Sequence, residues 1–404
     1  MLNRTLLIKG TIVFLATFLI ASLLFLFGVY SQSRNTRPAQ AIREIYLILS
    51  GRYEKLATPA EQAKHQAEAK AARNSLIHRE QGFQRRHEQI FSELGTDSLL
   101  RYLYADIDFI PDFNSSYCPK KNLEFFSKFA GHNVTCTRIE YENTEQKTYA
   151  LIIHSNVTKI GFLRNLLIYN HGHDGIPTEE ETFAEKLFIE TLRQGSDIML
   201  VSMPYKGLDE INYRIRVKTW DGWGEFNPVD LDRSHAVFEL FDTGKSNFIR
   251  YFIDNAVINV MHFRNQYNRI DYLGLSGGAT TGLYSCALLK KILSNCILVA
   301  GVMPAKFRLS RKNLGDVEQF SSSLLKEYKI IDLIREIGTS KTRLALVYNS
   351  SDACCFDNPS AGLFQEYLAS EKIRNTNFIV RESRIHGYDP AVMLELLGNK
   401  ANIK

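Results

Sequence analysis

The sequence has little excess charge and lacks the residue clusters that identify several protein classes. Its 49 basic and 44 acidic residues leave a formal charge of +5 over 404 residues. No stretch interleaves basic and aromatic residues as a nucleic-acid-binding surface does. None of its six cysteines has the spacing of a zinc site. These absences argue against a nucleic-acid partner and against a cysteine-ligated zinc.

The few cysteines leave the disulfide pattern open. Cys118 and Cys136 lie in a loop-rich stretch and can pair. Cys286 and Cys296 fall in an expected helix and an expected buried strand, where we expect free thiols that pack as small apolar residues. The sequence alone does not choose among the possible pairings.

Residues 10–30 contain no charged side chain and are long enough to cross a bilayer as a helix. Arg4 and Lys9 precede this stretch, which favours a cytoplasmic N-terminus. The alternative is a cleaved signal peptide, although its apolar core is usually shorter and only residues 31–33 resemble a cleavage site. We predict an uncleaved, single-pass signal-anchor, with the remainder of the chain outside the cytoplasm. Cleavage would instead make the protein secreted or periplasmic.

The chain is predicted to have three parts. Residues 1–33 form the transmembrane anchor or signal sequence, and residues 34–130 a helical stalk and a lead-in rich in Ala, Gln, Glu and Lys. Apolar residues recur weakly every seven positions in the stalk, which favours a solvated helix over a long coiled coil. Residues 131–404 form the third part, an α/β domain with a mostly parallel central sheet flanked by helices.

Strands and helices alternate along this third part. The expected strands are residues 135–142, 147–155, 165–170, 197–203, 271–275, 296–302, 343–349 and 377–382. The expected helices are residues 179–193, 236–266, 279–293, 324–337, 361–372 and 391–397. The first two strands read as a hairpin, and the later alternation indicates right-handed crossovers and a sheet covered on both faces. Functional groups in such sheets lie on loops at the carboxyl ends of the strands.

A G-x-S-x-G pattern, Gly274-Leu-Ser276-Gly-Gly278, lies between one expected strand and one expected helix. An abrupt strand-to-helix turn holds the serine in a strained conformation with its hydroxyl projecting. The neighbouring backbone passes so close that only glycine fits. We therefore predict that Ser276 is a nucleophile. The alternative is a glycine-rich turn that only packs tightly.

A serine nucleophile in this architecture is followed by an acid and then by a histidine. Asp352 follows the strand 343–349, with Asp357 and Glu382 as the next candidates. His386 is the only histidine after Ser276 in the sequence. The imidazole accepts and returns the serine proton, and the carboxylate fixes the imidazole tautomer.

The chemistry also needs donors for an oxyanion. One is the backbone N–H of Gly277, and the strand 165–170 runs into a His-Gly loop that can supply the second. We assign that second donor to the N–H of His173, with Gly172 beside it. The pair His171 and His173, joined by the next aspartate, also has a metal-binding spacing, but the oxyanion role already explains the position of this loop.

These motifs resemble those of the α/β-hydrolase superfamily from about residue 134 to the end of the chain. The G-x-S-x-G-G form is similar to that of the dienelactone-hydrolase-like, acetyl-esterase-like and prolyl-oligopeptidase-like branches. The resemblance implies hydrolysis of an ester, thioester or amide through an acyl-enzyme, with no metal and no organic cofactor. The oxyanion loop departs from the His-Gly-Gly-Gly form of many esterases.

We therefore expect a serine hydrolase that cleaves carboxylic esters of small molecules, sugars or lipids. A peptidase or an acyltransferase on the same fold, and a non-catalytic binding scaffold, remain open alternatives. The segment 205–233 carries both tryptophans and is expected to act as a lid or specificity loop. Tyr205, Trp220 and Trp223 are its candidate substrate-binding residues, with a packed irregular loop as the alternative.

Overall fold

The computed structural model describes most of the region after residue 108. The chain divides into two compact units, residues 1–70 and 71–404, and every described residue belongs to the second. The described residues are 109–115, 127–141, 146–157, 163–173, 175, 177, 182–204, 215–219, 222–226, 235, 238, 247–307, 316–321, 324–325, 329–352, 354, 356, 360–371, 373 and 376–398. The predicted anchor and most of the predicted stalk lie outside them. No helix in the described part of the chain has both the length and the apolar character needed to cross a membrane.

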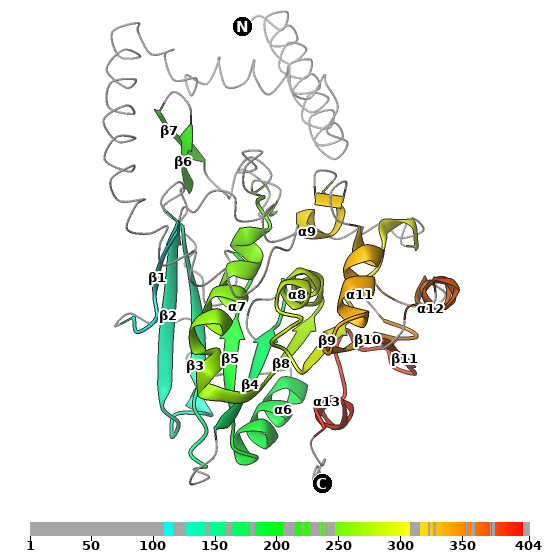
Figure 1. The fold of residues 1–404 in the computed structure, drawn as a ribbon, viewed down its shortest axis with the longest axis horizontal. Helices are drawn as coiled ribbons and strands as arrows, with labels where there is room; N and C mark the ends of the chain where they lie inside the picture. The colour runs from blue at the N-terminus through cyan, green and yellow to red at the C-terminus, as the bar shows by residue number, and fades with distance from the viewer. Residues whose placement is uncertain are drawn as a thin grey trace, which may run out of the picture. The chain divides into compact units, whose positions relative to one another are not determined.

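A nine-stranded sheet forms the centre of the described region (Figure 1). Its order is β1-β2-β3-β5-β4-β8-β9-β10-β11. The antiparallel part contains β1 (Phe109–Asp112), β2 (Val134–Tyr141) and β3 (Lys147–Ile153), and β3 also pairs antiparallel with β5 (Ser196–Val201). The strands from β5 onward are parallel: β4 (Arg164–Asn170), β8 (Tyr267–Leu275), β9 (Asn295–Val299), β10 (Arg343–Asn349) and β11 (Thr376–Arg381). The predicted α/β class with a mostly parallel central sheet is confirmed.

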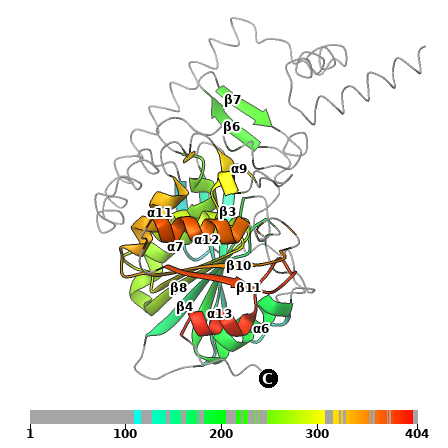
Figure 2. The same cartoon turned by 90° about the vertical axis from the view of Figure 1, so that its right-hand side faces the viewer.

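Helices cover both faces of the sheet, as the two views show (Figures 1 and 2). On one face lie α6 (Thr182–Arg193) and α13 (Pro390–Leu396). On the other lie α7 (Arg250–Phe263), α11 (Ile330–Gly338) and α12 (Ser360–Ser370). Helix α8 (Gly277–Leu288) lies on this second face too, in contact with α7 and α11. The central strands β4 and β8 are buried almost throughout, because parallel strands are covered on both sides.

The surface helices show the periodicity that such burial requires. In α11 the buried residues Ile330, Leu333, Ile334 and Ile337 recur every three or four positions, which gives the helix one apolar face. Helix α13 begins with Asp389 as its N-cap, whose carboxylate accepts from the backbone N–H of Ala391. Helix α8 is different, because all of its residues are buried. The element that follows the G-x-S-x-G motif therefore lies inside the domain.

Two expectations about the elements are wrong. The helix expected over residues 236–266 begins only at Arg250, because a turn at Asn247 precedes it, in which the Asn247 side chain accepts from the N–H of Ile249. The segment 205–233, expected to be a loop, contains an antiparallel hairpin, β6 (Ile215–Thr219) and β7 (Gly222–Phe226). Strand β1 lies within the predicted lead-in and joins the main sheet.

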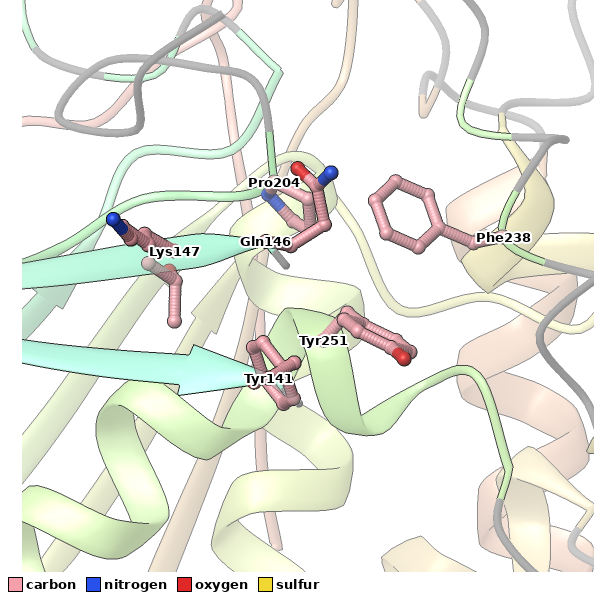
Figure 3. A pocket seen from close by; sticks show the side chains of 7 residues that line it. Tyr141, Gln146, Lys147, Pro204, Phe238 and Tyr251 are labelled. Carbon is pink, nitrogen blue, oxygen red and sulfur yellow. The ribbon is translucent and has the colours of Figure 1, made fainter. Parts of the chain in front are cut away.

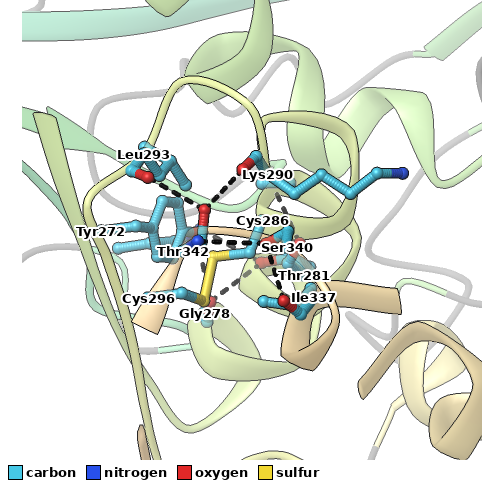
Figure 4. Close-up of a disulfide and its surroundings, with 12 residues drawn as sticks. Tyr272, Gly278, Thr281, Cys286, Lys290, Leu293, Cys296, Ile337, Ser340 and Thr342 are labelled. Atoms are coloured by element: carbon cyan, nitrogen blue, oxygen red, sulfur yellow. Dashed lines mark hydrogen bonds between the residues drawn. A yellow bond between two sulfur atoms is a disulfide. The ribbon is translucent and has the colours of Figure 1, made fainter. Parts of the chain in front are cut away.

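A disulfide joins Cys286 of α8 to Cys296 of β9 (Figure 4). The expectation that these two cysteines are free thiols is therefore wrong. Both are fully buried, and the nearby Thr342 hydroxyl donates to the carbonyl oxygens of Lys290 and Leu293 in the connection between the same two elements. Cys136 and Cys354 are also in disulfides, and their partners lie outside the described residues.

Candidate functional site

Ser276 lies at the turn between β8 and α8, in a backbone conformation that few side chains adopt. Its φ is 57° and its ψ is −127°. A non-glycine residue at positive φ is held there by its surroundings at an energetic cost, and such residues concentrate at functional sites. The N–H of Ser276 donates to the carbonyl oxygen of Val299 at 2.8 Å, which ties the turn to the neighbouring strand β9.

The glycines around Ser276 are required by close contact between backbones. A Cβ added to Gly274 would lie 2.3 Å from the carbonyl oxygen of Gly278, across the turn. A Cβ added to Gly278 would lie 2.3 Å from the carbonyl oxygen of Asn170, at the end of β4. Real Cβ atoms do not approach backbone this closely. The G-x-S-x-G-G pattern therefore reflects a turn packed against β4.

Asp352 and His386 are in direct contact. The Nδ1 atom of His386 lies 2.9 Å from Asp352 Oδ2 and 3.1 Å from Oδ1. The side chain of Asp352 is fully buried, and that of His386 is 21% exposed. The other ring nitrogen, His386 Nε2, is buried and has no hydrogen-bond partner within the described residues. The ring is therefore oriented through Nδ1, while Nε2 remains available as a base.

Strand order brings these residues to one edge of the sheet. Leu275 at the end of β8 is in register with Val299 of β9, which is in register with Val347 of β10. Asn349 at the end of β10 is in register with Arg381 at the end of β11. Ser276, Asp352 and His386 thus each follow the carboxyl end of a parallel strand. Of the other acids considered, Glu382 is exposed just beyond β11, and Asp357 lies outside the described residues.

Asn349 holds the loop that carries His386. Its side-chain amide donates to the carbonyl oxygens of Ile385 and Gly387, at 2.8 Å each. These two residues flank His386, and Asn349 is itself buried. The two hydrogen bonds fix the backbone on both sides of the imidazole. The sequence does not indicate this role of Asn349, because an asparagine that ends a strand gives no sign of a partner 36 residues later.

The loop after β4 packs against the start of α8. Gly172 has φ 89°, and a Cβ there would lie 2.6 Å from the carbonyl oxygen of Leu275. Its N–H donates to Asn170 Oδ1 at 3.2 Å, so this N–H is already engaged. The N–H groups of His173 and Gly277 have no hydrogen-bond partner among the described residues, and the His173 ring lies against Gly277. His171 is buried and hydrogen-bonded to the Tyr169 hydroxyl instead.

A compact cluster of two histidines and two carboxylates adjoins this loop. His173, His235, Asp316 and Glu318 each place one ligand-type atom within 4.8 Å of all the others. Asp316 Oδ2 lies 3.1 Å from His173 Nε2 and 2.7 Å from His235 Nδ1. Glu318 Oε1 lies 3.3 Å from His173 Nε2. Of the four residues, only His173 was a candidate from the sequence.

The charges in the cluster raise the pKa of His173 and lower the pKa of Asp316. Burial alone would lower the pKa of His173, but the carboxylates of Asp316 and Glu318 outweigh it and raise the pKa to about 10. Burial alone would raise the pKa of Asp316, but the rings of His173 and His235 hold it well below its usual range. The His173 ring beside Gly277 therefore carries a positive charge at neutral pH when only these side chains are present.

The expected substrate-binding residues are only partly placed. Trp223 lies in β7, opposite Lys218 of β6, while Tyr205 and Trp220 lie outside the described residues. A small cavity is present between the ends of β2 and β3 and helix α7 (Figure 3). None of the predicted site residues is among those that line it, which are Tyr141, Gln146, Lys147, Thr148, Pro204, Phe238 and Tyr251. Its wall adjoins the cluster, because the carbonyl oxygen of Pro204 accepts from His235 Nε2.

Comparisons with known proteins found similarity to solved structures only. No family model matches this sequence, and no curated protein matches it. The chain is similar to an acetyl xylan esterase from Thermoanaerobacterium (11% identity, TM-score 0.46), with 77% of this chain and 92% of that chain covered. It is similar to an acylaminoacyl peptidase from Pyrococcus horikoshii (11% identity, TM-score 0.41), with 65% of this chain and 40% of that chain covered. It is also similar to a putative dienelactone hydrolase from Klebsiella pneumoniae (9% identity, TM-score 0.38), with 64% of this chain and 90% of that chain covered.

These three solved structures are an esterase, a peptidase and a putative hydrolase, each sharing 9–11% of aligned residues with this chain.

Proposed function

We propose that this protein is a serine hydrolase that cleaves carboxylic esters, with Ser276, His386 and Asp352 as its catalytic triad. The observation that carries the proposal is the conformation of Ser276, a non-glycine residue at φ 57° where a parallel strand turns into a buried helix. A strained serine at this place in an α/β sheet is typical of a nucleophile. The contact between His386 and Asp352 at the same sheet edge supplies a base and its orienting acid.

The proposed steps follow from the chemistry of these groups. Ser276 Oγ attacks the ester carbonyl carbon while His386 Nε2 takes the hydroxyl proton, which makes the serine an adequate nucleophile at neutral pH. Asp352, bound to Nδ1–H, fixes the tautomer and stabilises the imidazolium. The imidazolium then returns the proton to the leaving alcohol, and water hydrolyses the acyl-enzyme by the same route.

The N–H groups of Gly277 and His173 are the proposed oxyanion donors. The Gly277 N–H lies at the start of α8, and the His173 N–H belongs to the loop that packs against it. Neither N–H has a hydrogen-bond partner among the described residues. Donors fixed before the reaction stabilise the developing negative charge without reorganisation. Because the N–H of Gly172 is bound to Asn170, the role supported for Gly172 is to let the loop approach α8.

The test is hydrolysis of p-nitrophenyl esters from acetate to palmitate by the full-length protein, compared with Ser276→Ala. We expect the variant to lose about 10⁶-fold in kcat, because the nucleophile is removed. Ser285→Ala is the matched control: this buried serine of α8 donates to the carbonyl oxygen of Thr281 and lies outside the proposed triad, so its variant should keep activity.

A fluorophosphonate probe extends this test to other acyl substrates. Labelling of the wild type that is absent in Ser276→Ala would support a serine nucleophile even without ester turnover, and would then indicate a selective peptidase or acyltransferase. Neither turnover nor labelling by the folded wild type would overturn the proposal in favour of a binding scaffold.

A further inference from the structure

We propose that His173, His235, Asp316 and Glu318 form a binding site for one divalent transition-metal ion of the zinc class, next to the oxyanion loop. The four side chains come from three segments that lie far apart in the sequence. Their ligand-type atoms all fall within 4.8 Å of one another. Four ligands around a zinc ion lie about 3.4 Å apart, since each is about 2.0–2.2 Å from the metal. The cluster therefore has the size of a single coordination sphere.

The contacts within the cluster are close but only partly aligned as hydrogen bonds. His235 Nδ1 is 2.7 Å from Asp316 Oδ2, yet it counts among the buried atoms without a hydrogen-bond partner. The same holds for Glu318 Oε1, at 3.3 Å from His173 Nε2. Polar atoms that are near one another without pointing at one another are what a shared ion between them requires.

Glu318 provides an independent indication. Its side chain is completely buried, and neither carboxylate oxygen has a hydrogen-bond partner within the described residues. A buried carboxylate without hydrogen bonds is strongly unfavourable unless it is neutralised or coordinates a metal. Glu318 contacts the His173 ring, at 3.3 Å from Nε2. The same nitrogen also contacts Asp316 Oδ2, at 3.1 Å.

His235 is already oriented as a metal ligand. Its Nε2 lies 2.8 Å from the carbonyl oxygen of Pro204, and because a carbonyl can only accept, Nε2 must carry the proton. In neutral His235 the lone pair is then on Nδ1, which lies 2.7 Å from Asp316 Oδ2. Two acceptor atoms this close need a proton or a cation near both of them. Histidines that bind a metal usually donate their other ring N–H to a backbone carbonyl or a carboxylate, which fixes the tautomer and the ring orientation.

Charge and donor type indicate which ion fits. Two carboxylates and two neutral imidazoles carry a charge of −2, which a divalent ion balances within a buried site. Imidazole nitrogen with carboxylate oxygen suits zinc and its first-row neighbours, whereas calcium and magnesium prefer oxygen ligands alone. Asp316 Oδ1 accepts from the N–H of Val317 at 2.8 Å, which leaves Oδ2 to face both histidines.

The ion would hold the oxyanion loop in place. His173 belongs to that loop and its ring lies against Gly277, while His235 precedes α7 and the two carboxylates follow β9. A metal shared by these segments would fix the loop that carries His173 against the start of α8. The ion thus has a positioning role, and this role rests on the proposed function. Ion binding by the four side chains does not depend on that function.

The experiment uses the full-length protein, stripped with chelator, loaded with excess Zn²⁺ and desalted. We expect about one zinc per chain by elemental analysis and a melting temperature raised by about 5 °C. Loading with Co²⁺ should give the visible absorption bands of a four-coordinate ion with nitrogen and oxygen ligands.

Variants identify the site. Glu318→Gln and His235→Gln should each lower zinc retention at least tenfold and remove the rise in melting temperature. Glu336→Gln is the matched control, because this carboxylate contacts Lys290 away from the cluster, and it should bind zinc like the wild type. Circular dichroism of each metal-free variant establishes that the variant is folded.

Zinc below one-tenth of an equivalent in the folded wild type, with an unchanged melting temperature, would overturn the site and leave a metal-free ionic cluster. Zinc that is retained equally by both cluster variants would overturn it too, because the ion would then be bound elsewhere. Ser276→Ala separates the two proposals: it should bind zinc normally while losing hydrolysis.

Discussion

At the scale of single residues, the conformation of Ser276 depends on a small number of close backbone contacts. The residue itself has an unfavourable φ, so the surrounding backbone must hold it there. Gly301, just after β9, supplies one of these contacts. A Cβ at this position would lie 1.9 Å from the carbonyl oxygen of Ser276 and 2.7 Å from the Cβ of Ala279. Neither atom belongs to a flexible side chain that can turn away.

We therefore expect Gly301→Ala to displace the turn at Ser276. The predicted effect is a loss of about 10²-fold in kcat, because small misplacements of a nucleophile are costly, and of about 1–3 kcal/mol in the free energy of unfolding. Initial rates on p-nitrophenyl acetate and urea unfolding measure both. Gly131→Ala is the control, since a Cβ there meets nothing within 4 Å. Wild-type kinetics in Gly301→Ala would show that the turn tolerates displacement.

At the scale of secondary structure, Asp197 connects the strand ends at the edge opposite the candidate site. It lies in β5, and its carboxylate accepts from the N–H of Ser155 at 2.8 Å and from the Tyr267 hydroxyl at 3.2 Å. His154 Nδ1 and Arg164 Nη1 lie 2.9 and 3.2 Å from it. The side chain is 2% exposed. One buried carboxylate thus links β3, β4, β5 and β8.

Burial alone would raise the pKa of Asp197, but His154 and the N–H of Ser155 lower it below its ordinary value of 3.8. A carboxyl whose pKa is lower in the folded state contributes stability at pH values above its unfolded pKa. This contribution is lost as the pH falls through the folded-state pKa. The stabilisation by Asp197 is therefore complete at neutral pH and disappears in acid.

We expect Asp197→Asn to lower the free energy of unfolding by about 2–3 kcal/mol at pH 7, since it leaves Arg164 with a weaker partner. Below pH 3.8 the unfolding curves of variant and wild type should converge. Urea denaturation across this pH range provides the measurement. Asp332→Asn, at an exposed ion pair with Arg335, should change stability by less than about 0.5 kcal/mol. A difference that persists unchanged in acid would contradict the charge explanation.

At the scale of the whole molecule, the disulfide between Cys286 and Cys296 joins the helix after Ser276 to the next strand of the sheet (Figure 4). Disulfides persist in chains that fold in an oxidising compartment. This supports the export that the apolar stretch 10–30 predicts, and we retain a membrane-anchored chain with its hydrolase domain outside the cytoplasm as a proposal. The bond also restricts the unfolded chain over the segment between the two cysteines.

We expect the double variant Cys286→Ala, Cys296→Ala to lose about 2–3 kcal/mol of stability, because the short loop is no longer closed in the unfolded state. The melting temperature should fall by about 5 °C, measured by calorimetry without reductant. Ester hydrolysis at 25 °C should be retained, because neither cysteine belongs to the proposed triad or oxyanion loop. Wild-type melting behaviour in the variant would mean that this bond contributes nothing to stability.

Local pattern and chain order were enough to predict several features of this protein. The strand at 343–349 was predicted at the residues where β10 occurs, because an apolar run followed by a polar turn is a local signal. The turn at Ser276 followed from glycine spacing. His386 followed from order alone, being the one histidine after the serine, and the structure places it against Asp352.

Contacts between segments far apart in the chain could not be predicted from the sequence. His235, Asp316 and Glu318 give no motif with His173, because the fold brings together residues as far apart in the sequence as His173 and Asp316, which are separated by 143 positions. For the same reason, the two hydrogen bonds of Asn349 and the disulfide between Cys286 and Cys296 could not be predicted from the sequence. Local periodicity reports which face of an element is buried, but contacts between loops depend on how the crossovers order the strands. The candidate nucleophile Ser276 could therefore be predicted from the sequence. The cluster of two histidines and two carboxylates could not.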